Sequence, residues 1–221
     1  MTRRDPDREK LRSSLRHLSR GNLLIVAQRA ADLVPKAKLQ ALVGDMIRIE
    51  TRESRASRLL DEVRRFHAAA LRGEYYESFD VNSKNYTQHS HGTDAFIAEF
   101  DHILRKTIRA SEKTPRARWR EAFELLFGLL RHIDECHDDV IFFADEAGSW
   151  QVGVDWRTAL PVYFRCLAEG ASSEEFAREV DRAISDFDEP GRIRHMATAR
   201  RAAGEEQRAA LRRFAAHRGQ A

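Results

Sequence analysis

The sequence is poor in the residues that interrupt regular structure and in those that cross-link it. It has 5 prolines, 11 glycines and 2 cysteines, Cys136 and Cys166, among 221 residues. Two cysteines thirty positions apart, with no Cys-x-x-Cys pair, provide neither the disulfide framework of a small secreted domain nor the usual four-ligand zinc site. The scarcity of proline instead favours long helices.

Long hydrophobic runs and an excess of charge of one sign are also missing. The longest apolar runs, 23–27 and 140–144, have five residues each, whereas a membrane-spanning helix needs about 20. The N-terminal charges are not followed by an apolar stretch, so we expect no signal peptide and a soluble, cytoplasmic, bacterial-type protein without a membrane partner. The net charge of +3 does not favour a whole surface that tracks nucleic acid.

The familiar catalytic motifs are absent as well. The chain has no Gly-x-x-x-x-Gly-Lys, Gly-x-Gly-x-x-Gly, Gly-x-Ser-x-Gly or His-Glu-x-x-His sequence. Both cysteines lie in apolar helical stretches, where burial raises the pKa of a thiol and makes it a poor nucleophile. We therefore expect no familiar catalytic residue and no cofactor.

What is present predicts helices, because apolar residues recur every three or four positions in nearly every long segment. We predict an all-α fold, an irregular multi-helix bundle or stacked helical hairpins, with about eight or nine helices, one long loop and a short extended segment. Ser54, Thr93, Asp155 and Ser172 are candidate N-caps. The helix that follows Asp155 is apolar around most of its girth, so we expect it to be central.

Two segments depart from the helical pattern. Residues 74–92 hold three tyrosines and many polar side chains without a helical period, which predicts the long loop. Residues 188–221 contain eight arginines and few large apolar side chains, so we expect residues 1–187 to form a single helical domain and the rest to be an Arg-rich arm or terminal helix.

The segment from His132 to Trp156 is the most acidic part of the chain and contains no Lys or Arg. Apolar residues alternate from Trp150 to Trp156, which indicates a short strand. One interpretation makes this segment a surface that binds a protein with a basic surface, because exposed aromatic anchors dominate interface energetics. The other makes its tryptophans buried anchors and its acids helix caps or ion-pair partners. The candidate contact residues are Asp138, Asp139, Asp145, Glu146, Trp150 and Asp155.

Three sets of His, Cys and acidic residues have spacings compatible with metal ligands: His89-x-His91, Glu99-x-x-His102, and Asp134-x-x-His137 with His132 and Cys136 nearby. A metal site in a helical bundle must point inward. The apolar stripe through Phe96, Phe100 and Ile103 instead leaves Glu99 and His102 on the flank of their helix. We therefore predict no metal ligands.

Arginine supplies 32 of the 38 basic residues and is concentrated near both ends of the chain. Guanidinium groups bind phosphates, so an accessory nucleic-acid-binding protein is the first alternative function. Its candidate contacts are Arg192, Arg194, Arg200, Arg201, Arg212 and Arg213. Interleaved acids and the lack of a nucleic-acid-binding motif instead favour solvated helix faces.

The preferred functional hypothesis is a non-catalytic protein-protein interaction or scaffold module that uses the acidic aromatic segment. A metal-dependent enzyme with an acid and histidine site near Asp134, His137, Asp138 and Asp145 is the second alternative.

Overall fold

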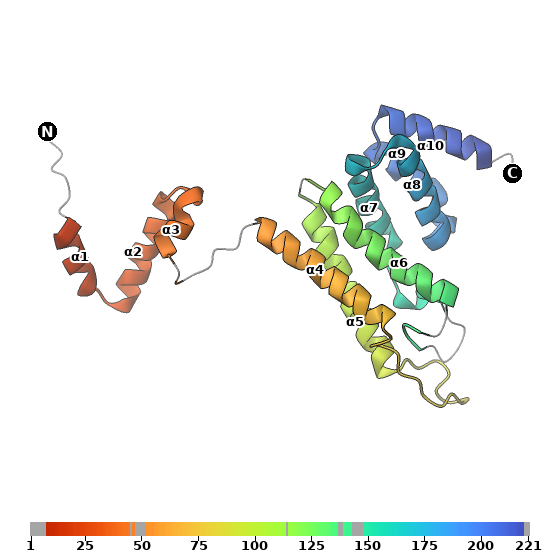
Figure 1. The fold of residues 1–221 in the computed structure, drawn as a ribbon, viewed down its shortest axis with the longest axis horizontal. Helices are drawn as coiled ribbons and strands as arrows, with labels where there is room; N and C mark the ends of the chain where they lie inside the picture. Colours follow the sequence, from red (N-terminus) through yellow and green to blue (C-terminus); the bar gives the residue numbers. More distant parts are fainter. Residues whose placement is uncertain are drawn as a thin grey trace. The chain divides into compact units, whose positions relative to one another are not determined.

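The computed structural model describes residues 8–44, 46, 52–113, 115–136, 139–142 and 148–218. Within these ranges it contains ten α-helices, four short 3₁₀ helices and no β-strand, which confirms the predicted all-α fold (Figure 1). The chain divides into two compact units, Met1–Ser54 and Arg55–Ala221. The structure thus places its division at 54/55, whereas the sequence predicted one at 187/188.

The first unit contains three helices whose side chains are largely exposed. They are α1 (Arg8–Arg16), α2 (Arg20–Leu33) and α3 (Leu39–Val43). The hydroxyl of Ser19 accepts a hydrogen bond from the backbone N–H of Asn22 and caps α2, as Ser does at many helix N-termini. None of the residues of α2 is buried, so tertiary packing within the described unit contributes little to this helix.

The second unit is built around α7. Its helices are α4 (Arg52–Leu71), α5 (His91–Ser111), α6 (Arg120–Cys136), α7 (Trp156–Gly170), α8 (Ser173–Phe187), α9 (Arg192–Ala202) and α10 (Glu205–Arg218). Helix α7 contacts α5, α6, α8 and α9 and buries residues such as Leu160, Phe164 and Leu167 completely. The prediction that this helix is central is confirmed.

Aromatic side chains fill the contacts between neighbouring helices of the second unit. Phe66 of α4 packs on Phe96 and Phe100 of α5, with ring centroids 5.3 and 6.2 Å away. Phe127 of α6 packs on Tyr163 of α7 with centroids 5.2 Å apart. Full burial of a Phe side chain contributes about 1.5–3 kcal/mol each, so these contacts are a large part of what holds the helices together.

The structure confirms two of the four predicted N-caps. Ser54 was wrong, because it lies inside α4, which begins at Arg52. Asp155 accepts a hydrogen bond from Arg157 N–H at the start of α7, and Ser172 accepts one from Glu175 N–H at the start of α8. Thr93 was the wrong cap for α5, because Ser90 accepts the hydrogen bond from Thr93 N–H and the helix begins at His91. The buried Thr93 hydroxyl instead donates to the backbone carbonyl of Phe142 at 2.7 Å.

The predicted extended segment over 150–156 is wrong. Its first part is a 3₁₀ helix, η3 (Ser149–Val152), and Trp156 already belongs to α7. The alternation in sequence reflects a turn that exposes Trp150 and buries Val152, and no described strand pairs with it. A two-residue repeat over so few residues does not distinguish a strand from a tight turn.

The described residues after 187, which are 188–218, pack on the rest of the second unit. Helix α10 contacts α8, and α9 contacts α7 and α8. His195, Ala199, Ala210 and Leu211 are completely buried in the same core cluster or beside it. Small alanines let these helices approach closely, which is why a segment with few large apolar residues still packs as two helices.

Candidate interaction surface at the loop end

Two loops meet at one end of the second unit, and we call this region the loop end. It comprises residues 72–90, which join α4 to α5, and the described residues 139–142 and 148–155 between α6 and α7 (Figure 1). The ring of Phe142 packs on Phe79 with centroids 5.1 Å apart, and His89 Nε2 lies 3.3 Å from Gln151 Oε1. The first loop therefore contacts both described parts of the second.

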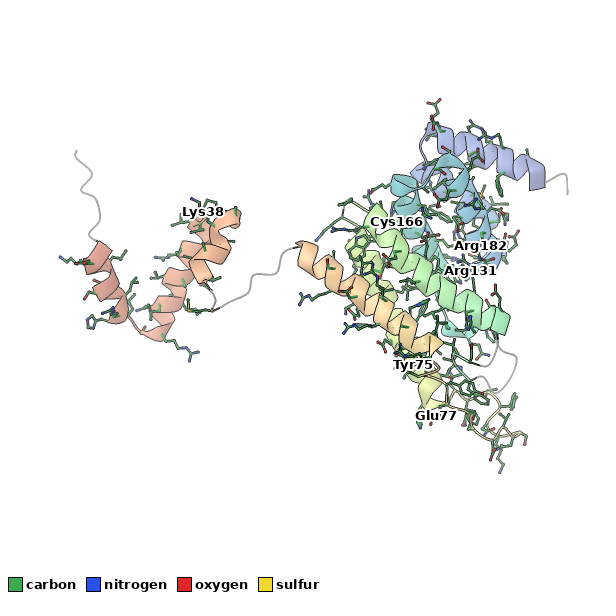
Figure 2. The ribbon with its side chains drawn as sticks, in the orientation of Figure 1. Lys38, Tyr75, Glu77, Arg131, Cys166 and Arg182 are labelled. Atoms are coloured by element: carbon green, nitrogen blue, oxygen red, sulfur yellow. The ribbon has the colours of Figure 1, made fainter. Side chains whose placement is uncertain are left out.

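The first loop is anchored where it leaves α4. The Tyr75 ring packs against Phe66 and Phe96, and its hydroxyl donates a hydrogen bond of 2.5 Å to Glu99 (Figure 2). Burial and the hydrogen bond to Glu99 raise the pKa of Tyr75, which therefore stays protonated. The Glu77 carboxylate accepts a hydrogen bond from Gly92 N–H in the first turn of α5, where a negative charge is favourable.

Asp134 at the end of α6 holds the second loop. Its carboxylate accepts hydrogen bonds from the Ser149 backbone N–H at 2.7 Å and the Ser149 hydroxyl at 2.8 Å. These two contacts fix the start of η3, the turn that carries Trp150. The role of Asp134 in the described structure is therefore to position this turn.

Trp150 is exposed and at the same time positioned. Solvent can reach 71% of the surface of this residue. The pyrrole edge of the indole lies against buried Gly148, so close that a Cβ atom on Gly148 would sit 2.6 Å from Trp150 Cδ1. An exposed aromatic ring held on a fixed turn is what a contact surface requires.

The six predicted contact residues have different fates in the structure. Asp138, Asp145 and Glu146 lie outside the described residues. Asp139 is exposed and lies 2.9 Å from His132 Nε2. Asp155 caps α7, as its bonds to Arg157 N–H and Thr158 Oγ1 show. The two described acids therefore already have partners within the chain, whereas Trp150 exposes a large apolar side chain.

The first loop exposes apolar side chains that were not predicted from the sequence. Tyr76, Val81 and Tyr86 are all exposed there. Tyr76 also contacts the Phe142 ring of the other loop, with centroids 6.1 Å apart. The cluster of tyrosines in a segment without a helical period was the available signal, because a buried loop rarely needs so many amphipathic rings.

The candidate metal ligands do not converge in the part of the chain that is described. No group of three or more His, Cys, Asp or Glu residues within it could hold a metal ion. His102 is exposed, Glu99 accepts from Tyr75, and His89 contacts Asp94 and Gln151. His137 lies outside the described residues.

No activated nucleophile or base stands out among the described titratable groups of the second unit. Burial raises the pKa of the Cys166 thiol to about 12, so this cysteine is protonated at neutral pH (Figure 2). Burial, and then the charge of His132, lower the pKa of His67, which favours its neutral form. Both pKa shifts are caused mainly by burial, and both favour the neutral form of the side chain.

Several of the predicted nucleic-acid contacts are occupied by acids of the same chain. Arg192 pairs with Asp181 and Glu189, each at 2.6 Å, Arg194 pairs with Asp188, and Arg213 pairs with Glu174. Arg201 donates to a carbonyl and a hydroxyl of its own helix. Arg200 and Arg212 have no ion pair within the described residues. Acids of the same chain thus neutralise part of the positive charge of these arginines.

None of the described helices combines the length and apolar character that crossing a bilayer requires. No protein-family model, curated protein or solved structure matches the chain.

Proposed function

We propose that the protein is a non-catalytic protein-protein interaction module whose contact surface is the loop end and whose anchor is Trp150. The observation that carries this proposal is the exposure of the Trp150 indole on a turn that Asp134 and Gly148 hold in place. Tyr76 and Tyr86 extend the exposed apolar surface on the neighbouring loop.

The energetics support an anchor at this position. A tryptophan buries about 150–250 Å² when it is covered, and each Å² of apolar surface contributes about 25 cal/mol. Since the ring already rests against Gly148, covering it costs less side-chain entropy than ordering a free indole would. The segment 132–156 contains several acids and no Lys or Arg in its sequence. Its negative charge suits a partner that has a basic surface around the pocket that receives the indole.

The proposal is tested by quantitative capture of proteins from nuclease-treated host lysate on the immobilised full chain and on Trp150→Ala. We expect at least one protein to be captured by the full chain and lost with the substitution. The matched control is Ile193→Ala, which removes an exposed apolar side chain from α9 and should leave capture unchanged. Capture that survives Trp150→Ala, or that is lost equally in both variants, contradicts the proposal.

Thermal and urea unfolding distinguish an interface residue from a structural one. Trp150→Ala should change the free energy of unfolding by less than about 0.5 kcal/mol, as surface substitutions do. Trp156→Ala should cost about 3–5 kcal/mol, because large aromatic truncations in cores do so. Trp156 is partly buried against the core and stacks on Phe187 with centroids 4.4 Å apart, which makes it a structural control. Equal, large losses would make Trp150 a structural residue.

A further inference from the structure

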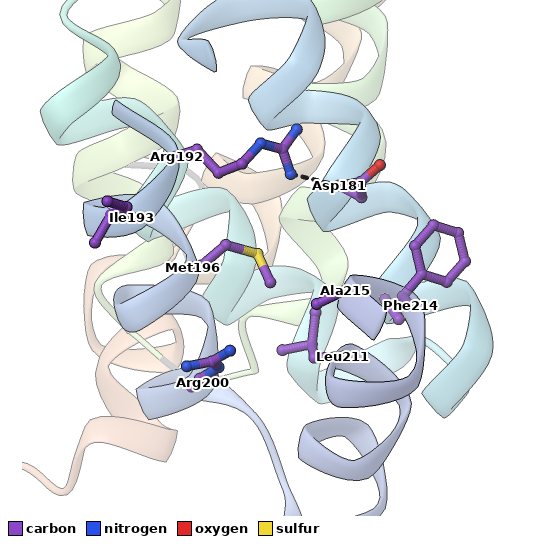
Figure 3. Close-up of a pocket in the computed structure, with 9 residues that line it drawn as sticks. Asp181, Arg192, Ile193, Met196, Arg200, Leu211, Phe214 and Ala215 are labelled. Carbon is purple, nitrogen blue, oxygen red and sulfur yellow. Dashed lines mark hydrogen bonds and ion pairs between the residues drawn. The ribbon is translucent and has the colours of Figure 1, made fainter. Parts of the chain in front are cut away.

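The last three helices enclose a hollow that the proposed interaction surface does not use. Its volume is about 420 Å³, within the roughly 300–1,000 Å³ of typical ligand pockets. The wall is supplied by one turn of α8, two turns of α9 and one turn of α10 (Figure 3). Its lining includes Ala177, Arg192, Met196, Arg200, Leu211 and Phe214.

The middle of the hollow is apolar. Leu211 is completely buried at its floor, and Met196 and Phe214 are partly buried beside it. Ile193 stands at the edge with 90% of its surface exposed. Apolar side chains around an open hollow remain in contact with water, which is unfavourable. An apolar group that enters the hollow would cover them, and this burial would favour binding.

The two ends of the hollow differ in charge. At one end Arg192 donates to Asp181 (Figure 3). It also donates to Ser185 and Glu189, so its guanidinium is fully engaged. At the other end Arg200 has neither an ion pair nor a hydrogen bond within the described part of the chain. Eight residues separate them, or about 12 Å along the helix axis. The hollow therefore has an apolar middle and one unneutralised guanidinium at a single end.

We propose that this hollow binds a small amphipathic carboxylate, with the carboxylate on Arg200 and the apolar chain over Met196, Leu211 and Phe214. A guanidinium binds a carboxylate through two parallel N–H···O hydrogen bonds, and such charge-assisted bonds are roughly twice as strong as neutral ones. The ion pairs of Arg192 keep the far end closed to a second anion.

The walls of the hollow are short along α8 and α10, which favours a small molecule over a helix of another protein. A docked helix is recognised through anchors at i, i+3, i+4 and i+7, which requires a groove of several turns on each side. Here α10 contributes residues within 211–215 and α8 contributes residues within 177–181, which is little more than one turn each.

Isothermal titration calorimetry of the full chain with octanoate tests the proposal, and 1-octanol is the uncharged comparison. We expect saturable one-to-one binding of octanoate and a much weaker heat with 1-octanol. Arg200→Gln should weaken octanoate binding about tenfold or more, since hydrogen bonds to charged groups contribute about 1.5–3 kcal/mol. Ala215→Trp places a large ring at the exposed rim and should abolish binding without loss of fold.

The matched control is Arg201→Gln on the next residue of α9. It removes the same charge from the same helix end but does not line the hollow, so octanoate affinity should stay within about twofold. Far-UV circular dichroism and melting confirm that each variant is folded. Absence of saturable octanoate binding, equal binding of 1-octanol, or equal losses in the two arginine variants overturns the proposal.

Discussion

At the scale of single residues, two helical glycines have opposite surroundings. Gly92 lies in the first turn of α5, and a Cβ atom there would be 2.2 Å from the backbone oxygen of Tyr75. Gly128 lies in the middle of α6, and nothing is within 4 Å of the position its Cβ would occupy. Glycine is therefore required at the first position by a close backbone approach and is merely tolerated at the second.

Replacing each of these two glycines by alanine should change the free energy of unfolding in opposite directions. Gly128→Ala should stabilise the protein by about 0.5–1 kcal/mol, because Ala is the better helix former. Gly92→Ala should destabilise it by about 1–3 kcal/mol, because the methyl group must displace a backbone carbonyl at the start of the first loop.

Urea unfolding followed by circular dichroism measures both values. If Gly92→Ala were stabilising, the contact between Tyr75 and the start of α5 would not hold in solution.

Gly148 connects residue-scale packing to the proposed interaction surface. Gly148→Ala should displace the Trp150 indole, since the new methyl group would lie within 2.8 Å of two of its ring atoms. The backbone at Gly148 is extended, so the substitution adds no backbone strain. We expect a change in tryptophan fluorescence and weaker partner capture with little change in stability. Unchanged fluorescence would mean that the indole does not rest on Gly148.

At the scale of elements, Asp188 organises the junction of α8 and α9. Its carboxylate accepts from Gly191 N–H at 3.0 Å and lies 2.7 Å from Nε2 of the completely buried His195. Arg194 also pairs with it at 2.8 Å. Burial opposes ionisation, but the hydrogen bond with His195, the hydrogen bond from Gly191 and the charges of His195 and Arg194 outweigh it. They hold the pKa of Asp188 below its usual value.

Asp188→Ala should cost about 1–3 kcal/mol, because it leaves the buried His195 Nε2 without its carboxylate partner. Arg194→Gln is the control, since its half-exposed ion pair should contribute less than about 1 kcal/mol. Chemical unfolding of both variants at neutral pH measures the difference. Similar values for the two would show that the buried His195 contact adds nothing.

The lowered pKa of Asp188 also fixes the sign of a pH dependence. A carboxyl whose folded-state pKa is below its unfolded-state value, about 3.9, stabilises the fold above that pH. This contribution is lost as the pH falls through the lower folded-state pKa. Unfolding midpoints between neutral and strongly acidic pH should therefore drop less steeply in Asp188→Asn than in the unsubstituted chain. Identical slopes would contradict the assignment.

The sequence predicted those elements whose signals are local. Asp155 and Ser172 were correctly predicted as caps, because a cap bonds to a backbone N–H two or three residues away. Thr93 was not predicted correctly, since its hydroxyl is committed to Phe142, far along the chain. The bond between Asp134 and Ser149 also joins distant segments, so sequence spacing indicated a ligand or a base instead of a turn anchor. Trp150 was identified from composition, and the structure added its exposure.

At the scale of the whole molecule, the arginines of the C-terminal region bear on the alternative function. Three of the six candidate phosphate contacts pair with acids of α8 or the α8–α9 junction. Such a surface releases few counterions on binding DNA, so we expect no binding of a duplex oligonucleotide at physiological salt by fluorescence anisotropy. Tight binding whose log-log salt slope is about −0.9 per neutralised phosphate would instead favour the nucleic-acid function.

The division into two units predicts opposite results for two truncations. Residues 52–221 keep all of the second unit and its core, so this fragment should melt at the same temperature as the second unit of the full chain. Residues 1–187 lack α9 and α10, whose removal uncovers faces of α7 and α8 that now cover Leu211 and Ala199. Loss of a buried leucine alone costs about 2–5 kcal/mol.

The fragment 1–187 should therefore melt more than about 5 °C below the full chain or fail to fold. Each kcal/mol of lost stability lowers the melting temperature of a domain of this size by about 2–4 °C. Differential scanning calorimetry of the two fragments beside the full chain measures this. The fragment 52–221 is the control for truncation itself, since it loses more residues than 1–187 does. An unchanged transition in 1–187 would show that α9 and α10 are dispensable, as expected of an arm, and that the alanine-lined contacts with α7 and α8 contribute little to folding.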